Sequence, residues 1–284
     1  MIEFKNVNFR YSHNEAMPYI LSNLNIDIYD GEFIGLLGAN GSGKSTMAKM
    51  INCLLVPTSG RVIVNGLDSS IEENMLQIRR KVGFVFQNPE NQIVGTIVEN
   101  DVAFAPENLG LAPEIIEERV TFALDAVGLL DKRNAMTVNL SGGQKQRLAI
   151  AGVLAMKPEI LVLDEPTAML DAAGREAVIN LIQKINRELK ITVVLVTHFM
   201  EHSLLCDRII CLKNGDAEYF GRPADFFKKG KNYVSDFNLK MPFSYLLLEK
   251  MTEAGLNSGD EIYSAARDLD TLAERIYKNF LAQK

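Results

Sequence analysis

The 284-residue sequence lacks an apolar run long enough to cross a membrane. Its longest uninterrupted apolar stretches, such as Ile160–Leu163 and Val193–Val196, have the length of strands, whereas a transmembrane helix needs roughly 20 such residues. The first residues, Met1–Lys5, lack the basic and then apolar layout of a signal peptide. We therefore expect a cytoplasmic chain that contacts a membrane only through a partner.

Cysteine and positive charge are also scarce. Three cysteines, Cys53, Cys206 and Cys211, lie in apolar segments without the spacing of metal ligands, which predicts reduced thiols in the core. The formal net charge is −6, so the chain lacks the basic excess with which proteins displace counterions from nucleic acids. We expect no nucleic-acid partner.

Strands and helices alternate along most of the chain. Ile2–Phe9 and Ile20–Tyr29 alternate in polarity and predict an N-terminal antiparallel β-subdomain, and Phe33–Leu37 predicts a buried strand before a helix that begins near Lys44. Further expected strands are Arg61–Val64, Val82–Phe86, Ile160–Leu163, Thr192–Val196 and Arg208–Leu212, with a helix over Asp171–Leu189. This alternation predicts an α/β fold with a mostly parallel, doubly wound sheet.

Two regions depart from the alternation. Residues from about 90 to 156 favour helices, including Glu114–Val127 and Gly142–Met156, and predict a helical subdomain inserted into a domain that spans 1–222. Residues 223–284 predict a small helical C-terminal extension, with helices at Phe243–Ala254 and Leu269–Leu281 after a linker around 229–241.

A glycine-rich segment follows the strand Phe33–Leu37. It reads Gly38-Ala39-Asn40-Gly41-Ser42-Gly43-Lys44-Ser45 and continues with Thr46, which fits the phosphate-loop pattern G-x-x-x-x-G-K-[ST]. Glycines let the backbone N–H groups and the positive end of the following helix approach a phosphate closely. Lys44 is positioned to reach the β- and γ-phosphates of ATP, and the Ser45 hydroxyl to ligate Mg²⁺.

A second strand ends in two acids. Ile160–Leu163 leads directly into Asp164 and Glu165, where a phosphate loop requires a carboxylate that holds the metal. We expect Asp164 to hold Mg²⁺ and Glu165 to orient or deprotonate the attacking water. Together the two motifs predict a P-loop nucleoside triphosphatase.

The segment Leu140-Ser141-Gly142-Gly143-Gln144 narrows the class. It opens a helix with exposed N–H groups and makes a second anion site, which one nucleotide per chain does not explain. Here the sequence resembles the ABC ATPase family, whose signature is LSGGQ. The resemblance implies a head-to-tail dimer in which Ser141, Gly142, Gly143 and Gln144 act in trans on the partner's ATP.

Other elements of that family follow in order. Gln87 resembles the Q-loop glutamine that senses Mg²⁺ and γ-phosphate, and Ala168–Asp171 resembles the D-loop, which crosses the dimer interface. His198 resembles the switch histidine that contacts the γ-phosphate. Tyr11 matches the aromatic residue that stacks on adenine, although Phe9, two residues earlier, offers a second candidate.

Within the family, the chain resembles the ATP-binding A components of energy-coupling factor importers of vitamins and metal ions. Phe86–Phe104, Gly142–Gly152 and Phe237–Phe243 carry this resemblance, and details around Asn91–Val98 favour the first A-type subunit. The resemblance implies a second ATPase subunit in a heterodimer or homodimer, a transmembrane coupling (T) protein and membrane-embedded substrate-binding (S) proteins. It also implies a peripheral place at the cytoplasmic face of the membrane.

Two alternatives remain open at this point. The same catalytic residues serve the ATPase of a conventional ABC importer, and a soluble ABC ATPase is a further reading. The apolar residues of Ile93–Phe104 are candidates for the groove that receives the membrane partner, or for the ordinary core of the helical subdomain, because periodicity does not separate the two.

Overall fold

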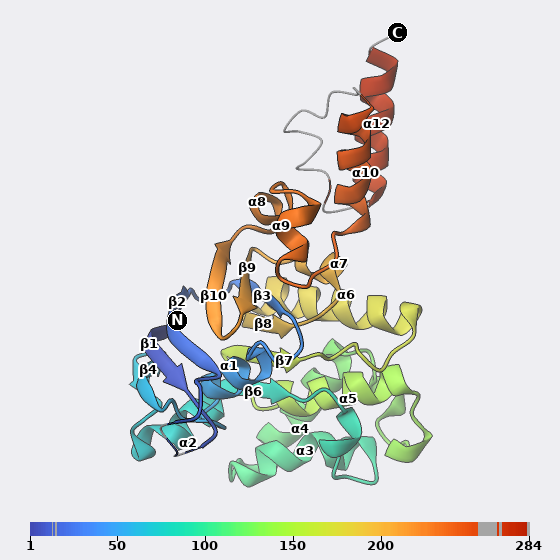
Figure 1. Ribbon diagram of the computed structural model, residues 1–284. Coiled ribbons are helices and arrows are strands. Elements are labelled where there is room, and N and C mark those ends of the chain that lie inside the picture. The colour runs from blue at the N-terminus through green and yellow to red at the C-terminus, as the bar shows by residue number, and fades with distance from the viewer. Residues whose placement is uncertain (13, 15, 255–265, 267–268, 283–284) are drawn as a thin grey trace.

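The computed structural model describes residues 1–12, 14, 16–254, 266 and 269–282 and contains two sheets (Figure 1). The first sheet has four strands in the order β2-β1-β4-β5, all paired antiparallel. Its strands are β1 (Ile2–Phe9), β2 (Leu21–Ile28), β4 (Ser59–Val64) and β5 (Leu67–Asp68). Along β2, Leu24, Ile26 and Ile28 are buried and the residues between them are exposed, as in a sheet with one face in the core. The predicted N-terminal antiparallel β-subdomain is confirmed.

The second sheet has six strands in the order β10-β9-β3-β8-β7-β6, and only its β9–β10 pair is antiparallel. Its strands are β3 (Phe33–Gly38), β6 (Val82–Val85), β7 (Ile160–Asp164), β8 (Thr192–Val196), β9 (Arg208–Lys213) and β10 (Asp216–Gly221). Every residue of β3, β7 and β8 is buried, because helices or the first sheet cover both faces. Since these strands are parallel, their carboxyl ends, Gly38, Asp164 and Val196, lie along one edge.

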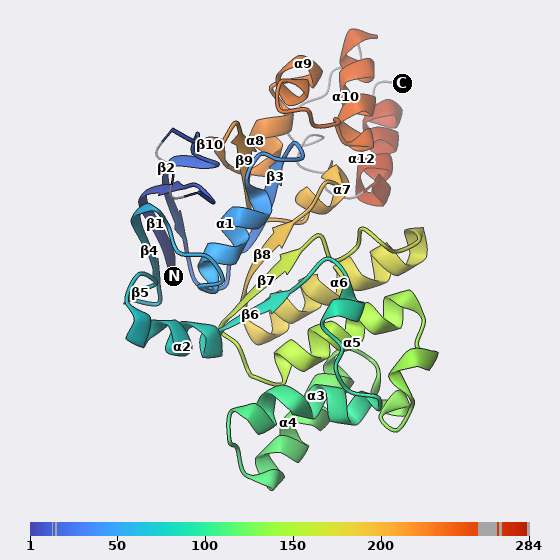
Figure 2. The ribbon, with the colours of Figure 1, turned by 60° about the horizontal axis from the view of Figure 1, so that its bottom comes forward.

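Alternate residues of the parallel sheet supply two cores. Ile34, Leu36 and Val162 belong to a cluster that includes Met47 of α1 (Lys44–Ile51) and the buried residues of the first sheet, which we call the first core cluster. Helix α1 therefore lies between the two sheets (Figure 2). Phe33, Leu37, Leu161 and Leu163 point to the opposite face, where α5 (Gly142–Leu154) and α6 (Ala172–Leu189) cover them.

The helical subdomain packs below this face in Figure 2. It contains α3 (Val98–Asn108), α4 (Pro113–Ala126), α5 and the short 3₁₀ turns η1 (Pro89–Asn91), η2 (Leu130–Lys132) and η3 (Thr137–Asn139). Val102, Leu124 and Leu148 bring the three α-helices into the cluster that also contains Phe33 and Leu161, which we call the main core cluster. Arg133 pairs with Glu99 of α3 and Glu117 of α4 and so links two helices of the insertion.

Within residues 1–222, two helices were not expected from the sequence. Helix α2 (Glu72–Lys81) precedes β6 and buries Ile78 against the first cluster. Helix α7 (Met200–Ser203) follows β8.

The chain beyond Gly221 forms α8 (Pro223–Phe227), α9 (Lys231–Ser235), α10 (Phe243–Glu253) and α12 (Leu269–Ala282). Figure 1 and Figure 2 show α10 and α12 side by side at the end of the molecule opposite the helical subdomain. The expected linker around 229–241 is instead packed: it contains α9, and Val234 and Phe237 are buried in the main core cluster. The boundary at residue 222 stays a prediction. Among the described helices, none is both long enough and apolar enough to span a bilayer.

Candidate functional site

The turn between β3 and α1 has a backbone that requires glycine. Gly38, Gly41 and Gly43 have φ angles of 146°, 79° and 102°, a region that residues with a Cβ rarely adopt. A Cβ on Gly43 would lie 2.5 Å from Leu21 Cδ2, and one on Gly38 would lie 2.4 Å from the Leu212 carbonyl oxygen. The loop therefore fits closely between the first sheet and β9.

Polar groups converge inside this loop. Lys44 Nζ donates hydrogen bonds to the carbonyl oxygens of Gly38 (2.9 Å) and Ala39 (2.8 Å). Burial lowers the pKa of Lys44, and the carboxylates of Glu165 and Asp164 oppose that shift. Ser42 Oγ is buried without a hydrogen-bond partner among the described residues, and no side chain caps the N-terminus of α1. A buried cation, an unpaired hydroxyl and an uncapped helix N-terminus are the groups that a phosphate satisfies.

A hydroxyl and a carboxylate meet where α1 passes the end of β7. Ser45 Oγ donates to Asp164 Oδ1 at 2.9 Å. Burial raises the pKa of Asp164, and the hydrogen bond from Ser45 opposes this effect. Hydroxyl and carboxylate oxygens are the ligands that Mg²⁺ prefers, and a divalent cation would stabilise the charged form of this buried acid. The pair therefore fits a magnesium ion beside the phosphate loop.

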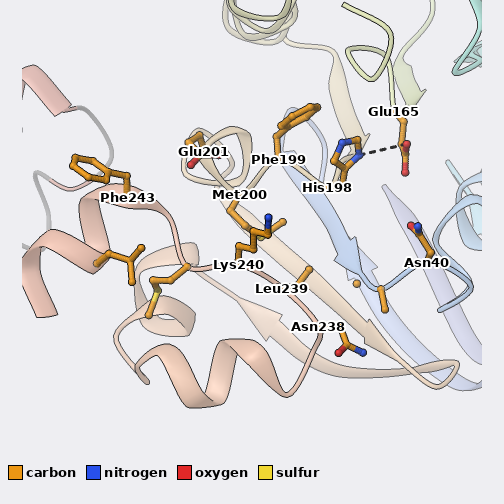
Figure 3. Close-up of a pocket in the computed structure, with 14 residues that line it drawn as sticks. Asn40, Glu165, His198, Phe199, Met200, Glu201, Asn238, Leu239, Lys240 and Phe243 are labelled. Atoms are coloured by element: carbon orange, nitrogen blue, oxygen red, sulfur yellow. Dashed lines mark ion pairs between the residues drawn. The ribbon is translucent and has the colours of Figure 1, made fainter. Parts of the chain in front are cut away.

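Glu165 receives contacts from two other segments. Gln87, directly after Phe86 beyond β6, donates from Nε2 to Glu165 Oε2 at 3.2 Å, and His198 Nδ1 lies 3.4 Å from the same oxygen (Figure 3). The Glu165 N–H donates to the Val196 carbonyl oxygen at 3.0 Å. The φ of Glu165 is 50°, a left-handed conformation that costs on the order of 1 kcal/mol in a residue with a side chain. The turn after β7 thus holds this carboxylate in one place at an energetic cost.

Tyr11 and Phe9 take different positions. Phe9 is buried in the first core cluster, whereas the Tyr11 side chain is 64% exposed and packs edge-on against the Phe9 ring at 4.9 Å. The Tyr11 hydroxyl lies 3.0 Å from Thr46 Oγ1 at the start of α1. Of the two aromatics, Tyr11 is therefore the one with a free ring face beside the phosphate loop.

The signature residues open α5 through a capping box. Ser141 Oγ accepts a hydrogen bond from the Gln144 N–H at 3.3 Å, and Gln144 Oε1 accepts from the Ser141 N–H at 2.9 Å. Next to this turn, Asp171 caps α6 by accepting from the Gly174 N–H at 2.8 Å. The positions where a Cβ would extend from Gly142 and Gly143 face Leu170 and Gly174, so the signature turn and the D-loop adjoin.

A cavity of about 650 Å³ lies beside the phosphate loop (Figure 3). The chain before residue 222 lines it with Gly38, Ala39, Asn40, Glu165 and residues 198–201, and the chain beyond 222 lines it with residues 238–241, Phe243 and Leu246. Among the described lining residues, none belongs to the signature. Sequence reasoning missed the contribution of 238–246 to this cavity, because that contact joins segments far apart in the chain.

The structure thus divides the predicted site residues into two groups. Lys44, Ser45, Gln87, Asp164, Glu165 and His198 gather at the carboxyl ends of the parallel strands, with Tyr11 and Thr46 at the adjacent end of α1. Ser141–Gln144 and Asp171 form a separate group at the N-termini of α5 and α6.

Comparisons with known proteins agree with this geometry. The family model for the ABC transporter matches residues 21–168. The energy-coupling factor transporter ATP-binding protein EcfA1 of Caldanaerobacter subterraneus subsp. tengcongensis is 47% identical over 263 residues, which are 92% of this chain and 95% of the relative. EcfA1 of Clostridium novyi is 44% identical over 96% of this chain and 98% of the relative.

Solved structures show the same likeness. CbiO1 from Clostridium perfringens, part of the ABC transporter complex cbiONQ, has a TM-score of 0.76 and 35% identity over 87% of this chain and 98% of that one. The ATP-binding cassette MJ0796, a dimer in a post-hydrolysis state bound to ADP and Pi, has a TM-score of 0.70 and 36% identity over 78% of this chain and 99% of that one. The P-loop NTPase fold predicted from the sequence is confirmed, and the chain belongs to the ABC transporter ATPase family, among its energy-coupling factor transporter ATP-binding proteins.

Proposed function

We propose that this chain hydrolyses ATP at an interface with a second ATPase and thereby drives an energy-coupling factor importer. The observation that carries the proposal is the convergence of a phosphate cradle around Lys44, a metal-binding pair and a held carboxylate at one edge of the sheet. The names of the relatives, which are ATP-binding proteins of such transporters, support the coupling to transport.

ATP would bind with its phosphates against the N–H groups of residues 38–46 and its adenine against Tyr11. Ser42 Oγ and Lys44 Nζ are placed to contact phosphate oxygens, for which Lys44 would give up its bonds to loop carbonyls. Ser45 and Asp164 would hold Mg²⁺, with Gln87 beside them, and the ion would neutralise charge between the β- and γ-phosphates when bound.

Glu165 is the group placed to act on the attacking water. Its carboxylate accepts from Gln87 and lies beside His198, so both neighbours restrict the direction in which its free lone pairs point. Glu165 would orient the water and accept its proton as the water oxygen bonds to the γ-phosphorus and the bond to the β-phosphate oxygen breaks. His198, with a side chain 46% exposed, remains free to contact the γ-phosphate.

The signature group would act on the nucleotide of the other subunit. Ser141–Gln144 do not line the cavity that contains Glu165, and their helix N-terminus offers N–H groups to an anion. A dimer of the related cassette bound to ADP and Pi supports such pairing. ATP would close the pair because it gains contacts from both chains, and phosphate release would open it, with Asp171 at the interface.

The helical subdomain would transmit this movement to the membrane partners. Within the segment Ile93–Phe104, Val98 and Val102 are fully buried, whereas Val94 is 61% and Phe104 50% exposed. Val98 and Val102 are therefore core residues of the helical subdomain, whereas Val94 and Phe104 are free to contact a membrane partner. We expect the exposed residues to contact a transmembrane coupling (T) protein that also binds substrate-binding (S) proteins, which would place the chain on the cytoplasmic face of the membrane.

The C-terminal helices offer a second contact for the other ATPase. Phe243 and Leu269, at the facing ends of α10 and α12, are 61% and 52% exposed and line an apolar hollow with Leu247, Leu272, Ala273, Ile276 and Tyr277. Contiguous exposed apolar surface of this kind marks protein interfaces. We expect this apolar surface to contact a second, different ATPase in a heterodimer. In a homodimer it would contact the same surface of a second copy of this chain.

The test of the catalytic assignment is Glu165→Gln in the complex purified with its second ATPase. Glutamine keeps the volume and an oxygen that accepts from Gln87, so the structure should be retained, but it cannot take a proton. We expect ATP binding to remain and turnover to fall by roughly 10²–10⁴-fold. Glu176→Gln, at an exposed position of α6, is the matched control. Full turnover in Glu165→Gln would contradict the assignment.

The rival ATPase of a conventional importer is distinguished by what accompanies the tagged chain from gently solubilised membranes of its native cell. A second ATPase, one coupling membrane protein and several small membrane proteins support the energy-coupling function. A paired permease with an extracytoplasmic binding protein would replace it, and no membrane protein at all would favour a soluble ABC ATPase.

A further inference from the structure

Arg175 links two segments of the site that the motifs treat separately. It is the fourth residue of α6 and is half-buried. Its Nη1 donates to the carbonyl oxygen of Leu170 in the D-loop at 2.9 Å, and its Cζ lies 4.7 Å from the centre of the Phe199 ring. One guanidinium therefore contacts both the D-loop and the residue that follows His198.

Phe199 passes this contact on to the histidine. Its ring centre lies 4.2 Å from that of His198, with an interplanar angle of 37° (Figure 3). The Phe199 N–H donates to Thr197 Oγ1 at 3.0 Å, which fixes the backbone on the other side of the ring. His198 in turn lies 3.4 Å from the Glu165 carboxylate. A continuous set of contacts thus runs from Leu170 through Arg175, Phe199 and His198 to Glu165.

The stability of α6 does not account for an arginine at this position. The positive end of a helix dipole disfavours a cation in the first turn, and Asp171 already caps this helix. The contacts do require a guanidinium, because its planar group stacks on a ring while an N–H in the same plane donates sideways to a carbonyl. A lysine ammonium lacks that combination.

We propose that Arg175 is a positioning residue for hydrolysis, which holds Phe199 and His198 in register with Glu165 and ties them to the D-loop. The proposal rests on the function proposed above for His198 and Glu165. Because Leu170 adjoins the signature turn, displacement of the D-loop by a docking partner moves the acceptor of the arginine's hydrogen bond. The switch histidine of one site then senses the approach of the other subunit.

The test compares Arg175→Gln, Arg175→Lys and Phe199→Leu in the complex with the second ATPase. We expect kcat to fall on the order of 10-fold in each, since each variant loses the contact between the guanidinium and the Phe199 ring, which contributes up to about that factor. The KM for ATP should change by less than about twofold in the two arginine variants, because Arg175 does not line the cavity beside the phosphate loop. The matched control is Arg187→Gln, which removes an exposed arginine from the last turn of the same helix and should leave kcat unchanged.

A double-mutant cycle separates positioning from a general effect on folding. Arg175→Gln combined with Phe199→Leu should lose no more activity than either alone, because both interrupt one path. Additive losses, a rise in KM with kcat intact, or full activity in Arg175→Lys would overturn the proposal. The Glu165→Gln variant separates the catalytic assignment of Glu165 from the positioning role of Arg175. If Glu165→Gln retains turnover, the catalytic assignment fails whatever the Arg175 variants do. If Glu165→Gln is inactive and Arg175→Gln is fully active, only the positioning role fails.

Discussion

We expect the buried His202, four residues after His198, to make the stability of this ATPase sensitive to acid. His202 lies in α7, 8% exposed, with Nδ1 3.4 Å from Thr197 Oγ1 and its ring 5.1 Å from that of Phe199. Burial lowers its pKa from the ordinary 6.5 to about 4, and the charges of Arg175 and His198 add to this effect. In the folded protein the ring therefore stays neutral at pH values where the unfolded chain binds a proton.

The sign and size of the effect follow from this difference. Because the unfolded state takes up the proton first, the contribution of His202 to stability is full above pH 6.5 and is lost as pH falls toward 4. At about 1.4 kcal/mol per pH unit, the gap between the two pKa values corresponds to roughly 3 kcal/mol of unfolding free energy. That is a large share of the 5–15 kcal/mol that is typical of a whole domain.

The assay is urea unfolding of the wild type and of His202→Gln at several pH values between 7.5 and 4.5. Glutamine does not titrate and retains a group that can pair with Thr197, so its unfolding free energy should fall less steeply below pH 6.5. Asp101 and Asp164, whose pKa values are raised by burial, are present in both proteins and cancel in the difference. Parallel pH profiles of the two proteins would refute the reasoning.

Three further predictions concern the site. Asp164→Asn should keep the hydrogen bond from Ser45 yet raise the Mg²⁺ concentration needed for half-maximal hydrolysis more than tenfold. ATP binding measured in EDTA, which should not change, is the control, and an unchanged Mg²⁺ titration would contradict the prediction. Gly43→Ala should abolish ATP binding, because the backbone strain at φ 102° and a 2.5 Å contact with Leu21 would displace the loop. Gly41→Ala, whose Cβ would meet nothing within 4 Å, tests the backbone strain alone, and equal losses of ATP binding in the two variants would exclude the steric explanation. Where two copies of this chain pair with each other, mixing Lys44→Ala and Ser141→Arg chains should leave one composite site intact. No recovery of turnover in such a mixture would count against a signature that acts in trans.

The central part of the fold was predictable because its patterns are local. One apolar strand runs into a glycine loop and another runs into Asp164 and Glu165. Each of these segments predicts both a buried strand and the polar groups that lie at its carboxyl end. Parallel pairing then brings those ends together without further information. Tyr11 and Phe9 show where such local patterns stop, since only burial in the folded chain separates the core residue from the exposed one.

Elements with weak local patterns were missed. Helix α2 fully buries only Ile78 of its ten residues, with Met75 partly buried beside it, so its apolar stripe is too short to stand out in the sequence. Strand β10 lies at an edge of its sheet with no residue fully buried, and its polar and apolar residues alternate only over the four positions 216–219. The packing of residues 229–241 depends on aromatic contacts between Phe226, Phe237 and Tyr233, whose partners become neighbours only after folding.

The cavity beside the phosphate loop is lined by two distant parts of the chain, which has a consequence for selective inhibition. The phosphate-loop backbone on one side is a surface that very many nucleotide-binding enzymes present, so a compound that contacts it alone would act on all of them. The opposite wall, formed by residues 238–241, Phe243 and Leu246, comes from outside the phosphate loop and the catalytic strands. A compound anchored on Leu239 and Met241 while it reaches toward Glu165 would discriminate among these ATPases through side chains that take no part in hydrolysis.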